Sequence, residues 1–424
     1  MKKINLEFIK NNDGKRLVKD FFFIFSVNVT TFIFPLITFP YLVRTLGISK
    51  FGLLAFATSI TAYFLILVDY GFNLTATRAI SINRDAKEKV DEIFSAVMTI
   101  KIIIIFLGLG ILLLAIYLVP KLNEYWYVFL LSYGNVVGQA LFPMWLFQGI
   151  EKMKIGSTLN IVSKTVFTIL IFTMVHKESD FYLVPILSAS GFILAGIISL
   201  LLVKFKFEIS YSRQPVATLT KYIIDGWSIF LSNISVTLYT TATITFLGFF
   251  TTIENVGYYS VADRIISAVR GIMSPLSQVL FPFLCKKAKN DKKQALAINR
   301  KLYRAGGFLM LIASACIFIF AKEIIFLIFN KADSSSVSVL RIMSIIPFLT
   351  FLHSVFALLT MIAFGRNAEY SKIILSAAIL NTLLCIILIP VFDFKGAAIA
   401  VVLVEAYLLF RYIYFTEKND LKVL

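Results

Sequence analysis

The most constraining feature of this sequence is a succession of long apolar stretches separated by short polar gaps. A helix needs about 20 apolar residues to cross a hydrocarbon core about 30 Å thick. Six stretches meet that length without a charged residue, and six more are shorter or are interrupted by charged residues. We therefore predict an all-α integral membrane protein with twelve transmembrane helices. The predicted spans are 21–43, 51–68, 102–120, 125–150, 155–175, 181–203, 226–253, 256–284, 308–329, 342–365, 373–392 and 396–412.

The distribution of lysine and arginine predicts the orientation. Most of the 41 such residues lie before the first span and after the even-numbered spans. Cytoplasmic loops are enriched in these residues, so both termini are predicted to be cytoplasmic. The net charge of +17 mostly reflects this bias, and we expect no nucleic-acid partner. The cations of the opposite gaps are few: Arg44, Lys50, Lys121, Lys177, Lys322, Lys331 and Lys395.

Several classes of function lack their sequence signatures. The first 20 residues are too polar for a cleaved signal peptide, so the first span should be an uncleaved anchor. The three cysteines are scattered and lack metal-ligand spacing, and the two histidines are isolated. No glycine-rich phosphate-binding motif occurs, and no soluble segment is long enough for a nucleotide-binding domain. We expect no metal, no cofactor and no ATP hydrolysis by this chain.

The two halves of the chain match each other at a constant offset. Asn28 falls on Asn233 and Gly52 on Gly257, so the first span matches the seventh and the second matches the eighth. Six spans separate the copies, which predicts a parallel repeat about an axis along the membrane normal. The predicted organisation is a tail (1–20), an N-lobe (21–204), a cytoplasmic linker (205–221), a C-lobe (222–415) and a C-terminal tail (416–424).

Polar residues at helical spacing predict an interior surface. Lipid-facing helix surfaces should be apolar, so a polar stripe faces protein or water. The eighth span carries the longest stripe, which includes Ser260, Arg264 and Ser267. Close helix packing accounts for serine and threonine but not for a cation. The first, fifth and seventh spans contribute Asn28, Lys164 and Asn233, although Lys164 can also extend to the membrane surface.

Charged residues at membrane depth are costly and therefore indicate function. In the eighth span, Arg264 follows Asp263, and Arg270 lies further along. A structural network between Asp263 and Arg270, which share a helix face, is the alternative to a binding site. Asp69 near the end of the second span and Glu405 in the twelfth are acidic candidates for binding a coupling ion, as is Asp263. Each carboxylate can instead simply neutralise a nearby cation.

Several short segments carry a family resemblance. Residues 39–47 read FPYLVRTLG and are followed by Phe51-Gly52, residues 68–73 read VDYGFN, and residues 257–264 read GYYSVADR. These segments resemble the Wzx-type O-antigen flippases. That family is the polysaccharide-exporter branch of the superfamily that also holds the MATE drug exporters and the lipid II flippase. The resemblance covers almost the whole chain.

The resemblance implies a MATE-like, V-shaped bundle of two six-helix lobes that alternates access in the bacterial cytoplasmic membrane. Its substrate would be an oligosaccharide repeat unit on undecaprenyl diphosphate, moved from the inner to the outer leaflet. Membrane lipids, H⁺ or Na⁺, and a polysaccharide polymerase and ligase are the other partners implied. We assign Arg264 and Lys164 to the diphosphate with Arg270 in support. The sugar contacts would be Asn28, Asn233, Ser260 and Ser267.

Two other classes of function remain open from the sequence. A MATE-like exporter of small cationic drugs would favour acidic and aromatic groups in its cavity, whereas basic residues outnumber acidic ones inside the first-half spans. A membrane-embedded glycosyl-transferring enzyme usually has a large outward loop that bears its catalytic residues, and every outward gap here is short. We therefore expect a transporter rather than an enzyme.

Overall fold

The computed structural model describes residues 12–271, 273–330 and 333–421, and their side chains except those of 12–33, 273–279 and 282. The described residues form helices and no strand. The first half comprises α2 (Asn12–Asp69), α3 (Phe72–Asn83), α4 (Lys87–Leu118), α5 (Pro120–Glu124), α6 (Trp126–Leu141), α7 (Met144–Gly149), α8 (Met153–Met174), η1 (Glu178–Tyr182) and α9 (Leu183–Phe205). The second half comprises α10 (Val216–Phe250), α11 (Ile253–Gly271), α12 (Met273–Asn290), α13 (Lys292–Ile319), α14 (Ala321–Phe329), α15 (Ser334–Met343), α16 (Ile346–Phe356), η2 (Ala357–Ile362) and α17 (Asn367–Lys418).

Eight helical segments of the described chain are long and apolar enough to cross a membrane. Two of them, Phe34–Asn83 and Asn367–Lys418, contain 50 and 52 residues, more than twice the length that one crossing needs. Each contains a residue with positive φ, Gly47 at 75° and Asp393 at 50°. These breaks fall in the predicted gaps between the first and second spans and between the eleventh and twelfth. The chain is thus a multi-pass helical membrane protein.

Some helices are longer or more broken than hydropathy predicts. The first half of α2 runs toward Gly47, but beyond Asp69 the chain turns at Tyr70 and Gly71 and continues as α3. Asp69 is the last residue of α2, which agrees with its expected position near the end of the second span. Two further predicted spans, 125–150 and 256–284, are each covered by two successive helices, α6 with α7 and α11 with α12.

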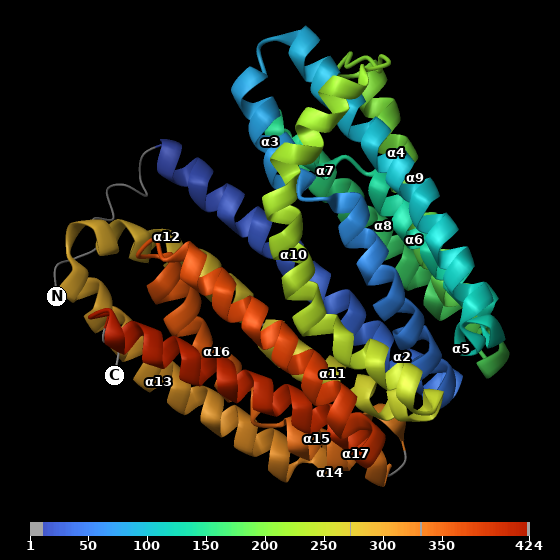
Figure 1. Ribbon diagram of the computed structural model, residues 1–424, viewed down its shortest axis with the longest axis vertical. Coiled ribbons are helices and arrows are strands. Elements are labelled where there is room, and N and C mark those ends of the chain that lie inside the picture. Colours follow the sequence, from blue (N-terminus) through green and yellow to red (C-terminus); the bar gives the residue numbers. More distant parts are fainter. Residues whose placement is uncertain (1–11, 272, 331–332, 422–424) are drawn as a thin grey trace.

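The helices gather in two groups that lie close together at one end and diverge toward the other (Figure 1). One group contains α3 to α9, and the other contains α11 to α17. Helices α2 and α10 connect them, because α2 packs on α6 and on α11 while α10 packs on α2 and on α17. The groups meet where α5 lies in one and α14 and α15 lie in the other.

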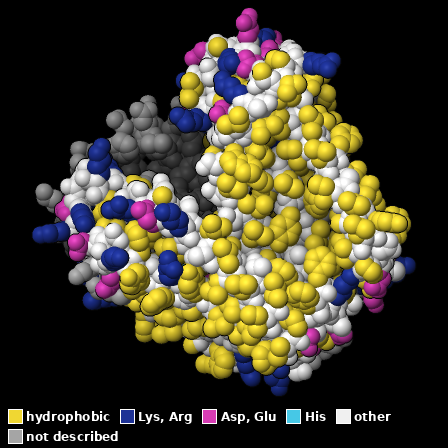
Figure 2. Space-filling model, viewed as in Figure 1, with side chains coloured by type: hydrophobic (Ala, Val, Ile, Leu, Met, Phe, Trp, Pro, Cys, Tyr) yellow, Lys and Arg dark blue, Asp and Glu magenta, His cyan; other side chains and the backbone are white. Residues whose placement is uncertain are grey.

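The outer surface of both groups is apolar between charged ends (Figure 2). Large apolar side chains such as Phe106, Tyr117 and Phe308 are 69%, 79% and 66% exposed. An exposed apolar surface that covers both groups would promote aggregation in water, but it is the surface expected of helices that face hydrocarbon. The arrangement agrees with helices that cross a bilayer.

Two glycines allow α2 and α11 to touch at backbone distance. A Cβ atom added at Gly52 would lie 2.3 Å from the carbonyl oxygen of Ile253, and one added at Gly257 would lie 2.3 Å from that of Ile48. Any larger residue would force the helices apart. Gly52 and Gly257 are the two positions that the internal sequence match pairs.

Two cations link the groups at the end where they meet. Arg44 donates from Nε to the carbonyl of Ile328 at 2.7 Å and from Nη2 to that of Leu327, in the last turn of α14. Lys121 donates to the carbonyls of Phe249, at 3.4 Å, and Thr251 at the end of α10. Helix C-termini carry unpaired carbonyls and partial negative charge, so they are natural partners for cations. Arg44 of α2 therefore caps the C-terminus of α14.

Candidate functional site

A first cavity lies among helices of the first half of the chain and reaches α11 of the second half. It has a volume of about 290 Å³ and is lined by residues of α2, α6, α8 and α9 and by Arg264 of α11. Lys164 of α8 lines the same cavity, so the structure brings together the two cations that the sequence predicts for an anionic ligand. No carboxylate occurs among the described residues that line it. The first cavity is thus electropositive.

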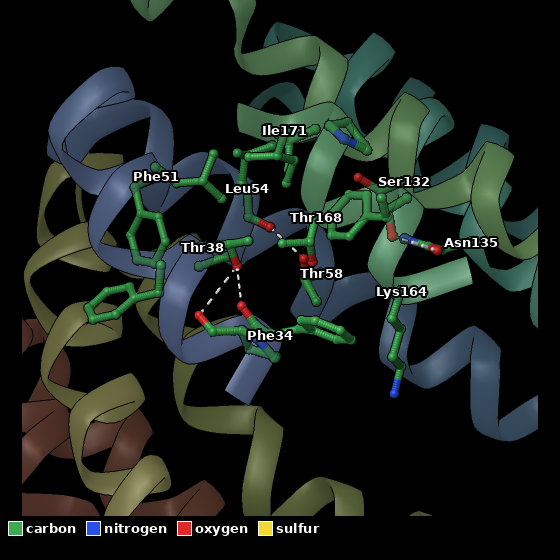
Figure 3. A pocket seen from close by; sticks show the side chains of 18 of the residues that line it. Phe34, Thr38, Phe51, Leu54, Thr58, Ser132, Asn135, Lys164, Thr168 and Ile171 are labelled. Atoms are coloured by element: carbon green, nitrogen blue, oxygen red, sulfur yellow. Dashed lines mark hydrogen bonds between the residues drawn. The ribbon is translucent and has the colours of Figure 1, made fainter. Parts of the chain in front are cut away.

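Three hydroxyl groups of the first cavity are held by hydrogen bonds to the protein (Figure 3). Thr38 donates to the carbonyl of Phe34 at 2.9 Å, and Thr58 donates to that of Leu54 at 2.7 Å. Ser188 donates to the amide oxygen of Asn135 at 3.0 Å. These hydrogen bonds hold the three oxygens in position. The long side chain of Lys164 extends from α8 and lines the same cavity (Figure 3).

The second cavity has a different polar inventory. Its volume is about 440 Å³, and α10 closes one side of it. Its lining includes one carboxylate, one ammonium group, four amides and one hydroxyl, together with apolar residues and Phe192, which also lines the first cavity. The polar members are Asp69, Lys101, Asn73, Gln139, Asn160, Asn233 and Thr237.

The opposite charges of the second cavity attract each other. Lys101 is only 3% exposed, and Asp69 is half-buried. A buried ammonium group needs a compensating carboxylate to remain charged. Asp69 is the carboxylate that interacts with Lys101, so the charged residues described in the lining have a formal sum of zero.

A buried charged cluster lies in the second group, away from both cavities. Glu405 of α17 is 1% exposed, and four side chains surround its carboxylate. Oε1 accepts from the hydroxyl of Tyr239 at 2.5 Å and lies 3.4 Å from Nη2 of Arg270. Oε2 accepts from Thr350 at 3.1 Å and lies 2.8 Å from Nε2 of His353.

Helix geometry explains why the two arginines of α11 separate. At 100° per residue, positions 264 and 270 differ by about 120° around the helix axis. Arg264 is exposed toward the first cavity, whereas Arg270 turns toward Glu405 and interacts electrostatically with Asp263. Asp263 and Arg270 thus belong to a charged network that also includes Glu405, as the structural alternative to a binding site predicted. Arg270 lines neither cavity.

The remaining predicted residues are dispersed. Asn233 lines the second cavity, not the first. Ser260 is 2% exposed, and Ser267 is exposed; neither lines a described cavity. The backbone of Asn28 belongs to α2, but its side chain lies outside the described residues.

Several lining residues that the sequence analysis did not name lie in a polar stripe that could have identified them. Ser132, Asn135 and Gln139 follow one another at helical spacing along α6, and they line the two cavities. The rule that identified the stripe on α11 identifies this one too. His353 had no such signal, because it meets Glu405 only through the packing of α16 on α17.

Comparisons with a protein family and with curated proteins agree with each other. Residues 17–288 match the family described as "Polysaccharide biosynthesis protein". A curated protein of Escherichia coli (strain K12) named "Putative O-antigen transporter" is 31% identical over 97% of this chain and 100% of its own length. A protein of the same name from Shigella dysenteriae is 27% identical over 91% of this chain and 96% of its own. These relatives are named as transporters and not as enzymes.

Solved structures share the fold at low sequence identity. The lipid II flippase MurJ in an inward closed conformation aligns with a TM-score of 0.73 and 13% identity, over 94% of this chain and 87% of that one. An inward-facing multidrug resistance MATE family transporter of the MOP superfamily aligns with a TM-score of 0.66 and 13% identity, over 92% and 98%. The helical bundle is therefore of the MurJ and MATE type, as expected.

Proposed function

We propose that this chain, which belongs to the polysaccharide biosynthesis protein family, is a flippase for oligosaccharides linked to undecaprenyl diphosphate. It moves an O-antigen or similar surface polysaccharide repeat unit from the inner to the outer leaflet of the bacterial cytoplasmic membrane by alternating access. The names of the curated relatives support transport of such material, and the fold is one that lipid flippases and drug exporters share. The fold alone does not choose between these substrates.

The observation that carries the proposal is the pair of cations in the first cavity. Lys164 comes from the first half of the chain and Arg264 from the second, and both line the same space. A diphosphate is strongly anionic, and arginine can bind it with two parallel hydrogen bonds while lysine acts as a point charge. A cationic drug would be repelled by this pair. The charge of the first cavity thus favours a lipid diphosphate over the substrates of multidrug exporters.

The proposal includes the finer architecture. Twelve crossings follow if the segments on either side of Gly47 and of Asp393 each span the membrane, and if α6 with α7 and α11 with α12 do so too. The mutual contact of Gly52 and Gly257 supports a parallel repeat. Gly52 faces the carbonyl of Ile253 and Gly257 faces that of Ile48, and Ile48 and Ile253 are themselves a pair at the same sequence offset. With both termini in the cytoplasm, the diverging ends of the lobes face the inner leaflet.

Ion coupling is part of the same proposal, with Asp69, Glu405 and Asp263 as the candidate acids. A carboxylate has about four acceptor positions, and those of Glu405 face four side-chain donors. Na⁺ would have to displace one of them. A proton can instead be exchanged with His353, whose Nδ1 has no partner among the described residues. This cluster therefore favours H⁺ over Na⁺.

Substitution of Arg264 tests the proposed function. Arg264→Ala should abolish surface polysaccharide in cells whose own flippase has been deleted, because loss of a charged hydrogen bond costs about 1.5–3 kcal/mol. Arg264→Lys should retain part of the activity, since it keeps the charge but loses the planar fork. The measurement is surface polysaccharide by immunoblot, normalised to the amount of protein in the membrane.

The matched control is Arg213→Ala, which removes an exposed arginine between α9 and α10. It should complement fully. Full complementation by Arg264→Ala at normal protein levels would contradict the role of this residue in the diphosphate site.

A further inference from the structure

Three of the four amides of the second cavity have no side-chain hydrogen-bond partner among the described residues, whereas the fourth, Asn73, bonds to Asp69. Gln139, Asn160 and Asn233 are half-buried, line the cavity, and make no side-chain hydrogen bond to another described residue. Each amide offers two donors and one acceptor oxygen. Half-buried polar groups that are left without protein partners are normally satisfied by water or by a ligand. Three of them around one cavity indicate a surface built to exchange hydrogen bonds.

The two cavities differ in charge as well as in hydrogen bonding. The first has two cations and no carboxylate among its described lining residues, whereas the second has Lys101 balanced by Asp69. An anionic group gains more from the first cavity. An uncharged group rich in hydroxyls gains more from the second, because every hydroxyl both donates and accepts, as amides do.

We propose that the second cavity is the subsite for the saccharide portion of the substrate, while the first holds the diphosphate. This inference rests on the proposed flippase function. It assigns the two parts of the lipid-linked oligosaccharide to two neighbouring cavities. The saccharide that fits is uncharged and bears hydroxyl or acetamido groups. Asp69 accepts from its hydroxyls, Lys101 donates to its oxygens, and Asn160 and Asn233 do both.

The position of Phe192 connects the two subsites. Its side chain on α9 lines both cavities, so the cavities are neighbours that share one wall. A diphosphate and the first sugars attached to it are contiguous, which requires adjacent sites. The second cavity, at about 440 Å³, has the volume of an ordinary small-molecule site. Each cavity also has a lining residue from the second half of the chain: Asn233 of α10 in the second cavity and Arg264 of α11 in the first.

Cysteine protection tests this division directly. The full-length protein is prepared with one cysteine at a time, either Thr237→Cys in the second cavity, Thr58→Cys in the first, or the native Cys316, which is exposed on α13. Maleimide labelling rates are measured alone, with undecaprenyl diphosphate, and with undecaprenyl diphosphate that carries one N-acetylglucosamine. We expect Thr58→Cys to be protected severalfold by both lipids, Thr237→Cys only by the sugar-bearing lipid, and Cys316 by neither.

Affinity measurements provide a second readout that does not depend on labelling. Asn160→Ala and Asn233→Ala should each weaken binding of the sugar-bearing lipid about tenfold and leave binding of the bare lipid unchanged, since about 1.4 kcal/mol corresponds to a tenfold change. The matched control is Asn83→Ala, an amide at the end of α3 that bonds its own helix and lines neither cavity.

The outcomes separate this inference from the function on which it rests. Equal protection of Thr237→Cys by both lipids, or no protection by either while Thr58→Cys is protected, would overturn the saccharide subsite and leave the flippase proposal standing. Equal weakening of both lipids by the asparagine variants would also overturn it. Failure of both lipids to bind or to protect Thr58→Cys would contradict the proposed function itself.

Discussion

At the residue scale, the clearest feature is that Glu405 is fully engaged inside the protein. Its partners come from three other helices, α10, α11 and α16, so the carboxylate holds the second group of helices together. A buried ion pair adds little net stability relative to apolar packing, but removing one member leaves a charge without compensation. Arg270 is the member at risk, because its Nε already has no partner among the described residues.

We predict that Glu405→Gln destabilises the protein by about 3–5 kcal/mol, the usual cost of breaking a buried pair. The combination of Glu405→Gln with Arg270→Met should recover much of that loss, since it also removes the uncompensated cation. Thermal unfolding of the purified single and double variants measures the coupling as a double-mutant cycle. Losses that simply add would show that the two residues do not act as a pair.

The same residues show what a sequence can predict about such a site. Lys164 and Arg264 were identifiable because each is a cation inside an apolar helix, and the first cavity contains both. Only part of the cluster around Glu405 could be predicted from the sequence. The spacing of Asp263 and Arg270 places these two residues on one face of α11. His353 and Tyr239 join the cluster through contacts between different helices, which no local pattern encodes.

At the element scale, the crossing of α2 and α11 depends on two positions that lack a side chain. The backbones approach so closely that a Cβ atom at Gly52 would also lie 2.6 Å from the nitrogen of Gly257. Hydropathy predicted where these helices exist, but it predicts neither how they cross nor how far a helix extends beyond its apolar stretch. It placed the third span from 102, whereas α4 begins at Lys87, because a helix can continue into water beyond the apolar stretch that reveals it.

Substitution of Gly52 tests the crossing. Gly52→Ala should destabilise the protein by about 1–3 kcal/mol, the usual cost of inserting a methyl group into a packed contact. Gly110→Ala is the matched control, because a Cβ atom there meets nothing within 4 Å, and alanine favours the helix. Thermal unfolding of the two variants should therefore shift in opposite directions or leave Gly110→Ala unchanged. A tolerated Gly52→Ala would mean that the helices can separate at no cost.

At the scale of the whole molecule, two polar contacts join the first half of the chain to the second at one end. Arg44 at the end of the first apolar segment reaches the last carbonyls of α14, and Lys121 of α5 reaches those of α10. Each cation comes from the first half of the chain, and each carbonyl end comes from the second. Opening the molecule at this end requires both contacts to break, so they favour the arrangement in which the opposite ends diverge.

We predict that Arg44→Ala and Lys121→Ala each shift the population toward molecules opened at this end. A hydrogen bond contributes about 1 kcal/mol, which corresponds to roughly a fivefold change in the equilibrium, and the double variant should shift further. Spin labels at Glu124 on α5 and Glu323 on α14 would report the change as a larger fraction of long inter-label distances. Lys322→Ala removes an exposed cation of α14 at the same end and should leave the distribution unchanged. If Arg44→Ala behaves like this control, the contact with α14 does not hold the two halves together at this end.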